Sequence, residues 1–266
     1  EDYAAMAEAA KRGTLLSFHE EEPSLVPSPG VNYGSAAAKH FGVPGAMASA
    51  ESAMIGRDIA LALDTGARVL FQHVSSAQSV ALIRAGKAMG AKIYAEVTPH
   101  HLSLTEDDVP AHGTYARMNP PLRKEADRQA LIAALADGTI DMIATDHAPH
   151  SAEEKGRGLE KSAMGIVGLE TAFPLLYTEL VKPGVISMER LMELLHDAPC
   201  RRFNIPTDTG FTVFDLNDTY RIDPADFLSM GKATPFTGWE VQGRCLLTAA
   251  GETAVWYDAD RLLKGE

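Results

Sequence analysis

The sequence has few cysteines, no long apolar run and no excess of positive charge, and each deficit excludes a class of protein. Only two of its 266 residues are cysteines, Cys200 and Cys245, and they form no CxxC pair. A disulfide framework is therefore not expected, and the cytoplasm is the expected compartment. No apolar run approaches the ~20 residues of a transmembrane helix. The formal net charge of -12 argues against a nucleic-acid or anionic-membrane surface.

Length and composition are those of a folded chain. At 266 residues the sequence suits one large domain or one and a half, and 45% apolar residues are enough for a core. Disorder is therefore not expected. The first residues, EDYAAMAEAAKRG, lack the apolar segment of a signal peptide. They read as a helix with no initiator methionine before it, so we expect the sequence to begin inside a larger protein.

Short apolar segments alternate with helical patterns along the first 200 residues. The apolar segments lack a polar alternation, which is typical of parallel strands buried on both faces. We expect strands within residues 14–21, 67–76, 91–101 and 139–150. We expect helices near residues 2–12, 49–66, 77–90, 124–138, 168–182 and 187–197. After residue 212, short strand patterns with turns predict a small β region. The expected fold class is therefore α/β, with a β/α domain over 1–205 and a small β region over 206–266.

Polar side chains gather where the predicted strands end. His19, His73, His100, His101 and Asp146 each lie at or just past the C-terminal end of one of them. In a (β/α) barrel these ends surround one mouth, which carries the active site. Two imidazoles and a carboxylate can bind a metal such as zinc, which acidifies bound water toward neutral pH. A carboxylate such as Asp146 can take up the proton and pass it to a leaving amide nitrogen.

Each of these features also has a purely structural interpretation. A single histidine at a strand end is more often a hydrogen-bonded structural residue than a ligand, and Asp146 with His147 could cap the next helix. The segment NPPLR, residues 119–123, could be a rigid turn or a loop that covers a polar ligand. The acidic run at residues 20–22 is typical of a solvated surface, or one of its carboxylates orients His19. Repetition at successive strand ends favours the functional interpretation.

Four motifs occur in an order that resembles a known enzyme family. They are EVTPHHLSLTEDD, ARMNPPLR, DGTIDMIATDHAPHSAEEK and GIVGLETAFPLL. Together they resemble the bacterial type I dihydroorotases of the amidohydrolase superfamily, over essentially residues 14–250. The resemblance implies the C-terminal half of a TIM-type (β/α)8 barrel, strands five to eight, followed by a small β segment. It also implies a zinc-dependent, reversible interconversion of L-dihydroorotate and N-carbamoyl-L-aspartate in pyrimidine biosynthesis.

The resemblance assigns the metal ligands. His19 and His73 resemble ligands at the ends of barrel strands five and six. Asp146 resembles the metal-bound carboxylate after strand eight, which also shuttles the proton. Two zinc ions are implied in the complete enzyme. The family's first metal motif, His-x-His, occurs nowhere in this sequence, and its bridging ligand after strand four would precede residue 1. We therefore expect a chain that lacks the N-terminal half of the barrel and is inactive alone.

Substrate contacts and partners also follow from the resemblance. Asn119 resembles a substrate contact on a mobile loop, and His150 resembles a residue that binds the substrate carboxylate or ring carbonyl. The backbone around Gly165 resembles the stretch that hydrogen-bonds the pyrimidine ring. The implied partners are the small-molecule substrate, the missing half of the barrel, a second copy in a homodimer, and aspartate transcarbamoylase. Neither nucleic acid nor a membrane is an expected partner.

Two other functions stay open on the sequence. Dihydropyrimidinases and allantoinases share the PHHL or PHYL theme, so another cyclic amidase is one alternative, although these enzymes typically lack MNPPLR followed by ATDHAPH. A non-catalytic dihydroorotase-like subunit that scaffolds aspartate transcarbamoylase is the other. Such homologues usually lose metal ligands, whereas His19, His73 and Asp146 are all kept here.

Overall fold

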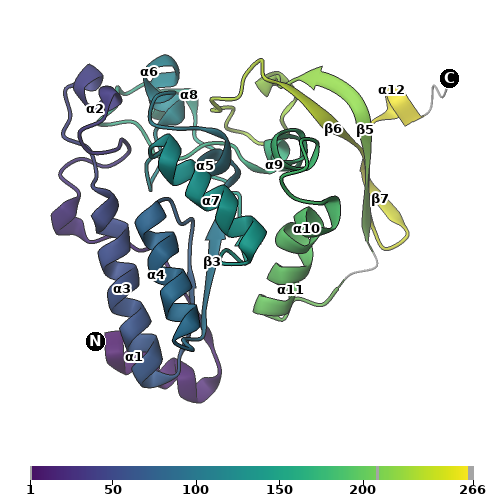
Figure 1. Cartoon of the computed structure of the whole chain (residues 1–266). Coiled ribbons are helices and arrows are strands. Elements are labelled where there is room, and N and C mark those ends of the chain that lie inside the picture. The colour runs from purple at the N-terminus through teal and green to yellow at the C-terminus, as the bar shows by residue number, and fades with distance from the viewer. Residues whose placement is uncertain (1, 208–209, 263–266) are drawn as a thin grey trace.

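The computed structural model describes residues 2–207 and 210–262, which form a parallel and an antiparallel sheet with helices around them (Figure 1). The strands are β1 Leu15–Phe18, β2 Arg68–Phe71, β3 Ile93–Val97, β4 Met142–Ile143, β5 Phe211–Arg221, β6 Glu240–Ala250 and β7 Thr253–Tyr257. The helices are α1 Asp2–Arg12, α2 Ala36–Phe41, α3 Ala48–Thr65, α4 Ala77–Ala88, α5 Pro99–Ser103, α6 Val109–His112, α7 Glu125–Asp137, α8 Ala152–Lys155, α9 Leu169–Leu176, α10 Met188–Met192, α11 Ala198–Phe203 and α12 Ala259–Leu262.

Strands β1 to β4 form one sheet in chain order, and all three pairings are parallel. Phe18 lies opposite Phe71, and Phe71 lies opposite Ala95. At least one helix connects each strand to the next, as a parallel crossover requires. Because the strands run the same way, their carboxyl ends meet at one edge of the sheet. The predicted α/β class with a small β segment is confirmed, and the strands of that segment are antiparallel.

Helices α3, α4 and α7 lie side by side against the parallel sheet (Figure 1). A glycine brings α4 close to its neighbours. A Cβ atom at Gly86 would lie 2.8 Å from Ile93 Cδ1 and 2.9 Å from Ile59 Cγ2, so a side chain there would have to displace these neighbours. Ile83 on the same helix is fully buried in the core between the helices and the sheet.

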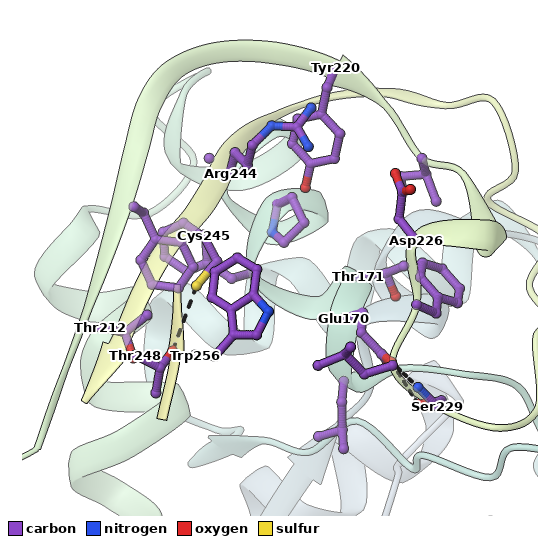
Figure 2. Close-up of a pocket in the computed structure, with 18 of the residues that line it drawn as sticks. Glu170, Thr171, Thr212, Tyr220, Asp226, Ser229, Arg244, Cys245, Thr248 and Trp256 are labelled. Atoms are coloured by element: carbon purple, nitrogen blue, oxygen red, sulfur yellow. Dashed lines mark hydrogen bonds between the residues drawn. The ribbon is translucent and has the colours of Figure 1, made fainter. Parts of the chain in front are cut away.

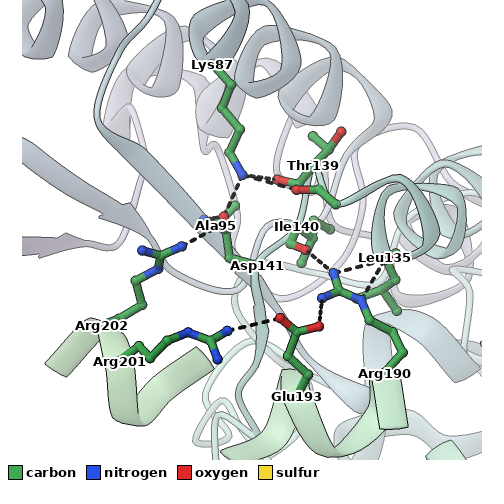
Figure 3. A network of polar contacts seen from close by, with 11 residues as sticks. Lys87, Ala95, Leu135, Thr139, Ile140, Asp141, Arg190, Glu193, Arg201 and Arg202 are labelled. Carbon is green, nitrogen blue, oxygen red and sulfur yellow. Dashed lines mark hydrogen bonds and ion pairs between the residues drawn. The ribbon is translucent and has the colours of Figure 1, made fainter. Parts of the chain in front are cut away.

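Asp141, directly before β4, joins three elements (Figure 3). Its Oδ2 accepts hydrogen bonds from Lys87 Nζ at 2.7 Å and from the Ala95 N–H at 2.9 Å. Its Oδ1 lies 3.6 Å from Arg202 Nη2, and the Arg202 guanidinium lies 3.9 Å from the centre of the Tyr94 ring. The carboxylate is largely buried, so it fixes α4, β3 and α11 at the end of the sheet opposite to the strand-end histidines.

Strands β5, β6 and β7 form an antiparallel sheet in that order. Helix α9 packs against it through Phe173, whose ring stacks on Phe214 with 3.7 Å between centroids. Gly243 makes room for this contact, because a Cβ atom there would lie 2.9 Å from Phe173 Cε1. In Figure 1, α9 to α11 lie between the parallel sheet and β5 to β7. Within residues 2–207 and 210–262, no helix is long and apolar enough to cross a membrane.

All four parallel strands are shorter than the segments in which the sequence predicts them. β4 has two residues where 139–150 was expected to be a strand, and 91–101 contains β3 followed by α5. The prediction for residues 98–101 is wrong because the Thr98 side chain accepts a hydrogen bond from the His101 N–H and caps a new helix. Past β4, Asp146 adopts φ +48, which an extended strand does not allow.

Substitution of Ile83 by alanine tests the packing of α4 on the sheet. Ile83 is 0% exposed, so Ile83→Ala is expected to lower the free energy of unfolding by about 2–5 kcal/mol. Leu82 on the same helix is 37% exposed, and Leu82→Ala is expected to change the free energy of unfolding by less than about 0.5 kcal/mol. Urea unfolding monitored by circular dichroism measures both, and equal losses would contradict this orientation of α4.

Candidate active site

Two histidines from neighbouring strand ends face each other. His19 follows β1 and His73 follows β2, and these strands pair in parallel, so both residues emerge at the same edge. His19 Nδ1 lies 2.9 Å from His73 Nε2, and the ring centroids are 4.7 Å apart with the planes nearly perpendicular. The structure thus brings together two residues that lie 54 positions apart in the chain.

Burial keeps His73 neutral. The pKa of His73 is lowered to about 4, first because burial disfavours the imidazolium and second because His19 lies beside it. His73 Nδ1 is buried without a hydrogen-bond partner in the described part of the chain. An imidazole that stays neutral at physiological pH keeps a lone pair available, which is the form that binds a metal ion.

The backbone is unusual at His73 and at Asp146. Their φ angles are +35 and +48, and Asn204 is the third non-glycine residue with a positive φ among those described. This region costs free energy for most side chains, and such outliers cluster at functional sites. Glu96 on β3 supports the turn at His73. Its carbonyl oxygen accepts a hydrogen bond from the Val74 N–H at 2.8 Å, and the backbone N–H of His73 lowers the pKa of its carboxyl.

Asp146 and Glu96 form the acidic part of this edge. Burial, followed by the charge of Asp146, raises the pKa of Glu96 to about 7. Burial also raises the pKa of Asp146, while His19 acts in the opposite direction. Sequence reasoning missed Glu96. A detectable signal existed, because a glutamate inside the apolar strand IYAEV is rare in a parallel sheet that is buried on both faces.

Asn119 reaches the histidine pair from the loop after β3. Its Nδ2 donates a hydrogen bond to Glu21 Oε2 at 2.7 Å and lies 3.4 Å from His19 Nε2. Glu21 Oε2 is itself 3.8 Å from His19 Nε2. Among the three glutamates at 20–22, Glu21 is therefore the one placed to orient His19. Glu20 is buried instead, and burial together with the neighbouring Asp58 raises its pKa to about 8.

His150 and Gly165 lie on adjacent segments past β4. His150 Nε2 is 2.9 Å from the Met164 carbonyl oxygen. Gly165 has φ +117, and a Cβ atom there would overlap the Cβ atom of Ala148. The Gly165 N–H donates to the Arg117 carbonyl at 3.0 Å, and the Gly165 carbonyl accepts from Lys155 Nζ at 2.8 Å. The N–H and the carbonyl of Gly165 are both hydrogen-bonded within the protein. Any hydrogen bond from this stretch to a substrate ring therefore has to come from neighbouring residues.

The donor atoms at the strand ends fit a metal ion in part. Imidazole nitrogens and a carboxylate suit zinc. Two nitrogens bound to one tetrahedral zinc at about 2.0–2.1 Å are about 3.3 Å apart, so the His19–His73 separation of 2.9 Å has to widen slightly. Across residues 2–207 and 210–262, no three His, Cys, Asp or Glu side chains are grouped closely enough to hold an ion. Asp146 lies within electrostatic reach of His19 without completing a three-ligand cluster.

His100 and His101 are buried in α5, and His101 has a structural contact on each ring nitrogen. Its Nδ1 lies 2.7 Å from Thr98 Oγ1, and its Nε2 lies 3.1 Å from the Pro120 carbonyl oxygen. Burial lowers the pKa of His101 to about 3, so the ring is neutral. His101 therefore fixes the 119–123 loop, which agrees with the structural interpretation of a strand-end histidine.

A cavity of about 770 Å³ lies elsewhere, between α9 and the antiparallel sheet (Figure 2). Its wall is mainly apolar, and the Arg244 guanidinium lies 3.8 Å from the centre of the Tyr220 ring. Ser229 Oγ donates to Glu170 Oε1 at 2.7 Å and lies 3.4 Å from His147 Nε2, so the cavity wall touches the segment after β4. None of the six site residues expected from the sequence lines this cavity.

Sequence comparison confirms the resemblance to the dihydroorotases. The chain is 46% identical over 267 residues to the dihydroorotase of Bacillus cytotoxicus, and it is equally similar to that of Bacillus anthracis. Each match covers 98% of this chain and 62% of the relative, so the chain spans less than two thirds of the length of these curated relatives. No protein-family model matches the sequence.

Solved structures with the same fold are cyclic amidases. The L-hydantoinase (dihydropyrimidinase) of Arthrobacter aurescens is 27% identical with a TM-score of 0.85, over 96% of this chain and 60% of that one. The D-hydantoinase of Thermus sp. covers the same shares with a TM-score of 0.85, and at 23% identity it bears on the fold alone. These likenesses confirm the predicted partial barrel with its appended β segment.

Lys155 tests the support of the Gly165 segment. Its side chain is buried, and Nζ donates to the Ala163 carbonyl at 2.9 Å as well as to that of Gly165. Lys155→Met leaves these acceptors without a donor, so the free energy of unfolding is expected to fall by about 1–3 kcal/mol. Lys161→Met, at an exposed position in the same segment, serves as the control. Guanidinium unfolding measures both, and a stable Lys155→Met variant would contradict this role.

Proposed function

We propose that the protein opens and closes the cyclic amide of L-dihydroorotate, because 98% of this chain aligns with the dihydroorotase of Bacillus cytotoxicus. The open product is N-carbamoyl-L-aspartate, and the reaction belongs to pyrimidine biosynthesis. The observation that carries the proposal is the convergence of His19 and His73 at the carboxyl ends of two paired strands. The chain spans 62% of its relatives' length, so the activity is proposed for the whole protein.

In this proposal His19 and His73 hold a zinc ion, with Asp146 as the carboxylate beside them. A bound zinc ion supplies the Lewis acidity that attack on an unactivated amide carbonyl needs. A carboxylate oxygen of Asp146 takes the proton from the attacking water and delivers it to the ring nitrogen that leaves. The partly buried position of Asp146, which raises its pKa, favours this uptake. The complete enzyme is proposed to hold two ions, the second through the His-x-His motif that this sequence lacks.

Asn119 and His150 are proposed to bind the substrate. Asn119 Nδ2 lies 3.4 Å from His19 Nε2 and can turn from Glu21 toward a ring carbonyl. His150 lies beside the Gly165 stretch, which is proposed to contact the pyrimidine ring. The polypeptide is proposed to divide near residue 205, between a partial barrel and a β region. We further propose a cytoplasmic homodimer that can associate with aspartate transcarbamoylase.

A hydantoinase-type activity is the second candidate. The likeness to the Arthrobacter aurescens L-hydantoinase, at 27% identity and a TM-score of 0.85, favours it. The two candidates differ in the substrate, because dihydroorotate carries a ring carboxylate and a simple hydantoin or dihydropyrimidine does not. The motifs MNPPLR and ATDHAPH and the 46% identity favour dihydroorotate. Ring opening of both substrate types by the full-length protein decides between them.

Asp146→Asn tests the proton carrier. With the acidic oxygen replaced by an amide nitrogen, kcat for dihydroorotate ring opening by the zinc-loaded full-length protein is expected to fall at least about 10²-fold. The loss of absorbance of the ring amide follows the reaction. An unchanged kcat would remove Asp146 from the mechanism. A wild-type protein that binds zinc and opens no cyclic amide would instead favour the scaffolding alternative.

His73→Asn tests the metal assignment. Loss of an imidazole ligand is expected to reduce the zinc retained after dialysis, as measured by elemental analysis of the purified protein. His196→Asn is the matched control, because His196 is exposed and pairs only with its neighbour Asp197 and with Cys200 in the described contacts. Equal zinc contents in the two variants would contradict the assignment of His73 as a metal ligand.

A further inference from the structure

Glu51 is a buried carboxylate outside the expected set of site residues. We propose that Glu51 is a positioning residue, which fixes the loop that carries His73 and, through Ser75 and Arg123, ties it to the loop that carries Asn119. The coupling of the two loops rests on the contacts alone. Its consequence for metal binding rests on the proposed function.

The Glu51 carboxylate is saturated with hydrogen bonds. Glu51 lies in the first turn of α3 and is 3% exposed. Its Oε2 accepts from the Ser75 N–H at 3.0 Å and from Ser75 Oγ at 2.6 Å. Its Oε1 accepts from the N–H and the hydroxyl of Ser76, both at 3.1 Å, and from the Ser79 hydroxyl. Five donors from one short segment therefore converge on a single side chain.

These donors explain why the position needs an anion. A hydroxyl can rotate to accept instead of donate, but the backbone N–H groups of Ser75 and Ser76 cannot. The carboxylate also lies at the start of α4, where the Ser76 side chain caps the helix and the helix dipole favours negative charge. His73 is two residues before this fixed segment. Its strained turn is thus held on one side by the Glu96 carbonyl, which accepts from the Val74 N–H, and on the other by Glu51.

Arg123 carries the connection to the second loop. Arg123 is 4% exposed, and its Nε donates to Ser75 Oγ at 3.2 Å. Its Nη1 donates to Asn32 Oδ1 at 2.7 Å and to the Ala46 carbonyl at 2.8 Å. Ser75 Oγ therefore donates to Glu51 and accepts from Arg123. Burial lowers the pKa of this guanidinium, and the negative charge of Glu51 acts in the opposite direction.

The network joins segments that follow three different strands. Asn32 belongs to the connection after β1, Ser75 to the one after β2, and Arg123 to the one after β3. A buried polar network whose members are satisfied makes the groups it joins rigid. Arg123 ends the NPPLR motif that begins with Asn119, so the motif is anchored at its far end to the His73 loop. His73 and Asn119 are thereby held in fixed relative positions without direct contact.

Glu51→Gln tests the proposal, with Asp141→Asn as the matched control. Both changes replace a largely buried, hydrogen-bonded carboxylate by an amide, but Asp141 lies at the opposite end of the sheet. The first readout is hydrogen exchange by mass spectrometry on the metal-free protein, for peptides that cover 73–79 and 119–123. The second is the affinity for Zn²⁺, measured by competition with a chromophoric chelator. Ser75→Ala removes the hydroxyl that bridges Glu51 and Arg123 and keeps the hydrogen bond from the Ser75 N–H to Glu51. It is the second variant if Glu51→Gln does not fold.

Glu51→Gln is expected to speed exchange in both loops and to weaken Zn²⁺ binding by about 10–100-fold, the usual cost of losing a residue that orients a ligand. Asp141→Asn is expected to lower thermal stability and to leave both readouts of the strand-end loops at the wild-type level. Ser75→Ala is expected to speed exchange at 119–123. The proposal is overturned if hydrogen exchange at 119–123 is unchanged in both the Glu51 and the Ser75 variants. It is also overturned if Glu51→Gln and Asp141→Asn change exchange in the two loops equally. Faster exchange together with a wild-type protein that binds no Zn²⁺ would support the coupling and reject the metal site.

Discussion

The parallel pairing of β1 to β4 is the constraint on which the candidate site depends. The register sets Phe18 beside Phe71 and Phe71 beside Ala95, so the residues that follow these strands emerge at one edge. His19 and His73 meet there for no local reason, since 54 residues separate them. The same pairing needs helices packed closely on the sheet, which the missing side chain of Gly86 allows. Core packing and site geometry are therefore two results of one sheet.

Buried charge serves different purposes at the two ends of this sheet. At the amino ends, Asp141 holds Lys87, the Ala95 N–H and Arg202, and no residue with a proposed chemical role lies among them. At the carboxyl ends, the Glu51 carboxylate accepts hydrogen bonds from the backbone N–H groups of Ser75 and Ser76, which follow His73 closely. A buried carboxylate contributes little net stability, because the cost of desolvation offsets the gain from its hydrogen bonds. At the carboxyl ends, the hydrogen bonds of Glu51 instead give the loops fixed positions.

Much of the fold and part of the candidate site could be predicted from the sequence. Helices with glycine after their last turn, such as α3 before Gly66, were predicted within one or two residues because the C-terminal signal is local. The meeting of His19 with His73 followed from the general rule that parallel strands end at one edge. Glu96 and Glu51 were missed because their roles depend on burial and on partners far along the chain. The end of β4 was also missed, since the sequence pattern of a strand continues through Ala144 and Thr145, whereas the pairing with β3 ends at Ile143.

If His73 and Asp146 have the roles proposed above, their positive φ angles set folding against chemistry at two positions. Each costs on the order of 1–3 kcal/mol, and a glycine would adopt the same backbone without that cost. A search for more stable variants that ignores chemistry would therefore replace both residues by glycine. These replacements would remove an imidazole and a carboxylate from the strand ends. On the proposed mechanism, the most stable pair of residues at these two positions is therefore a catalytically inert one.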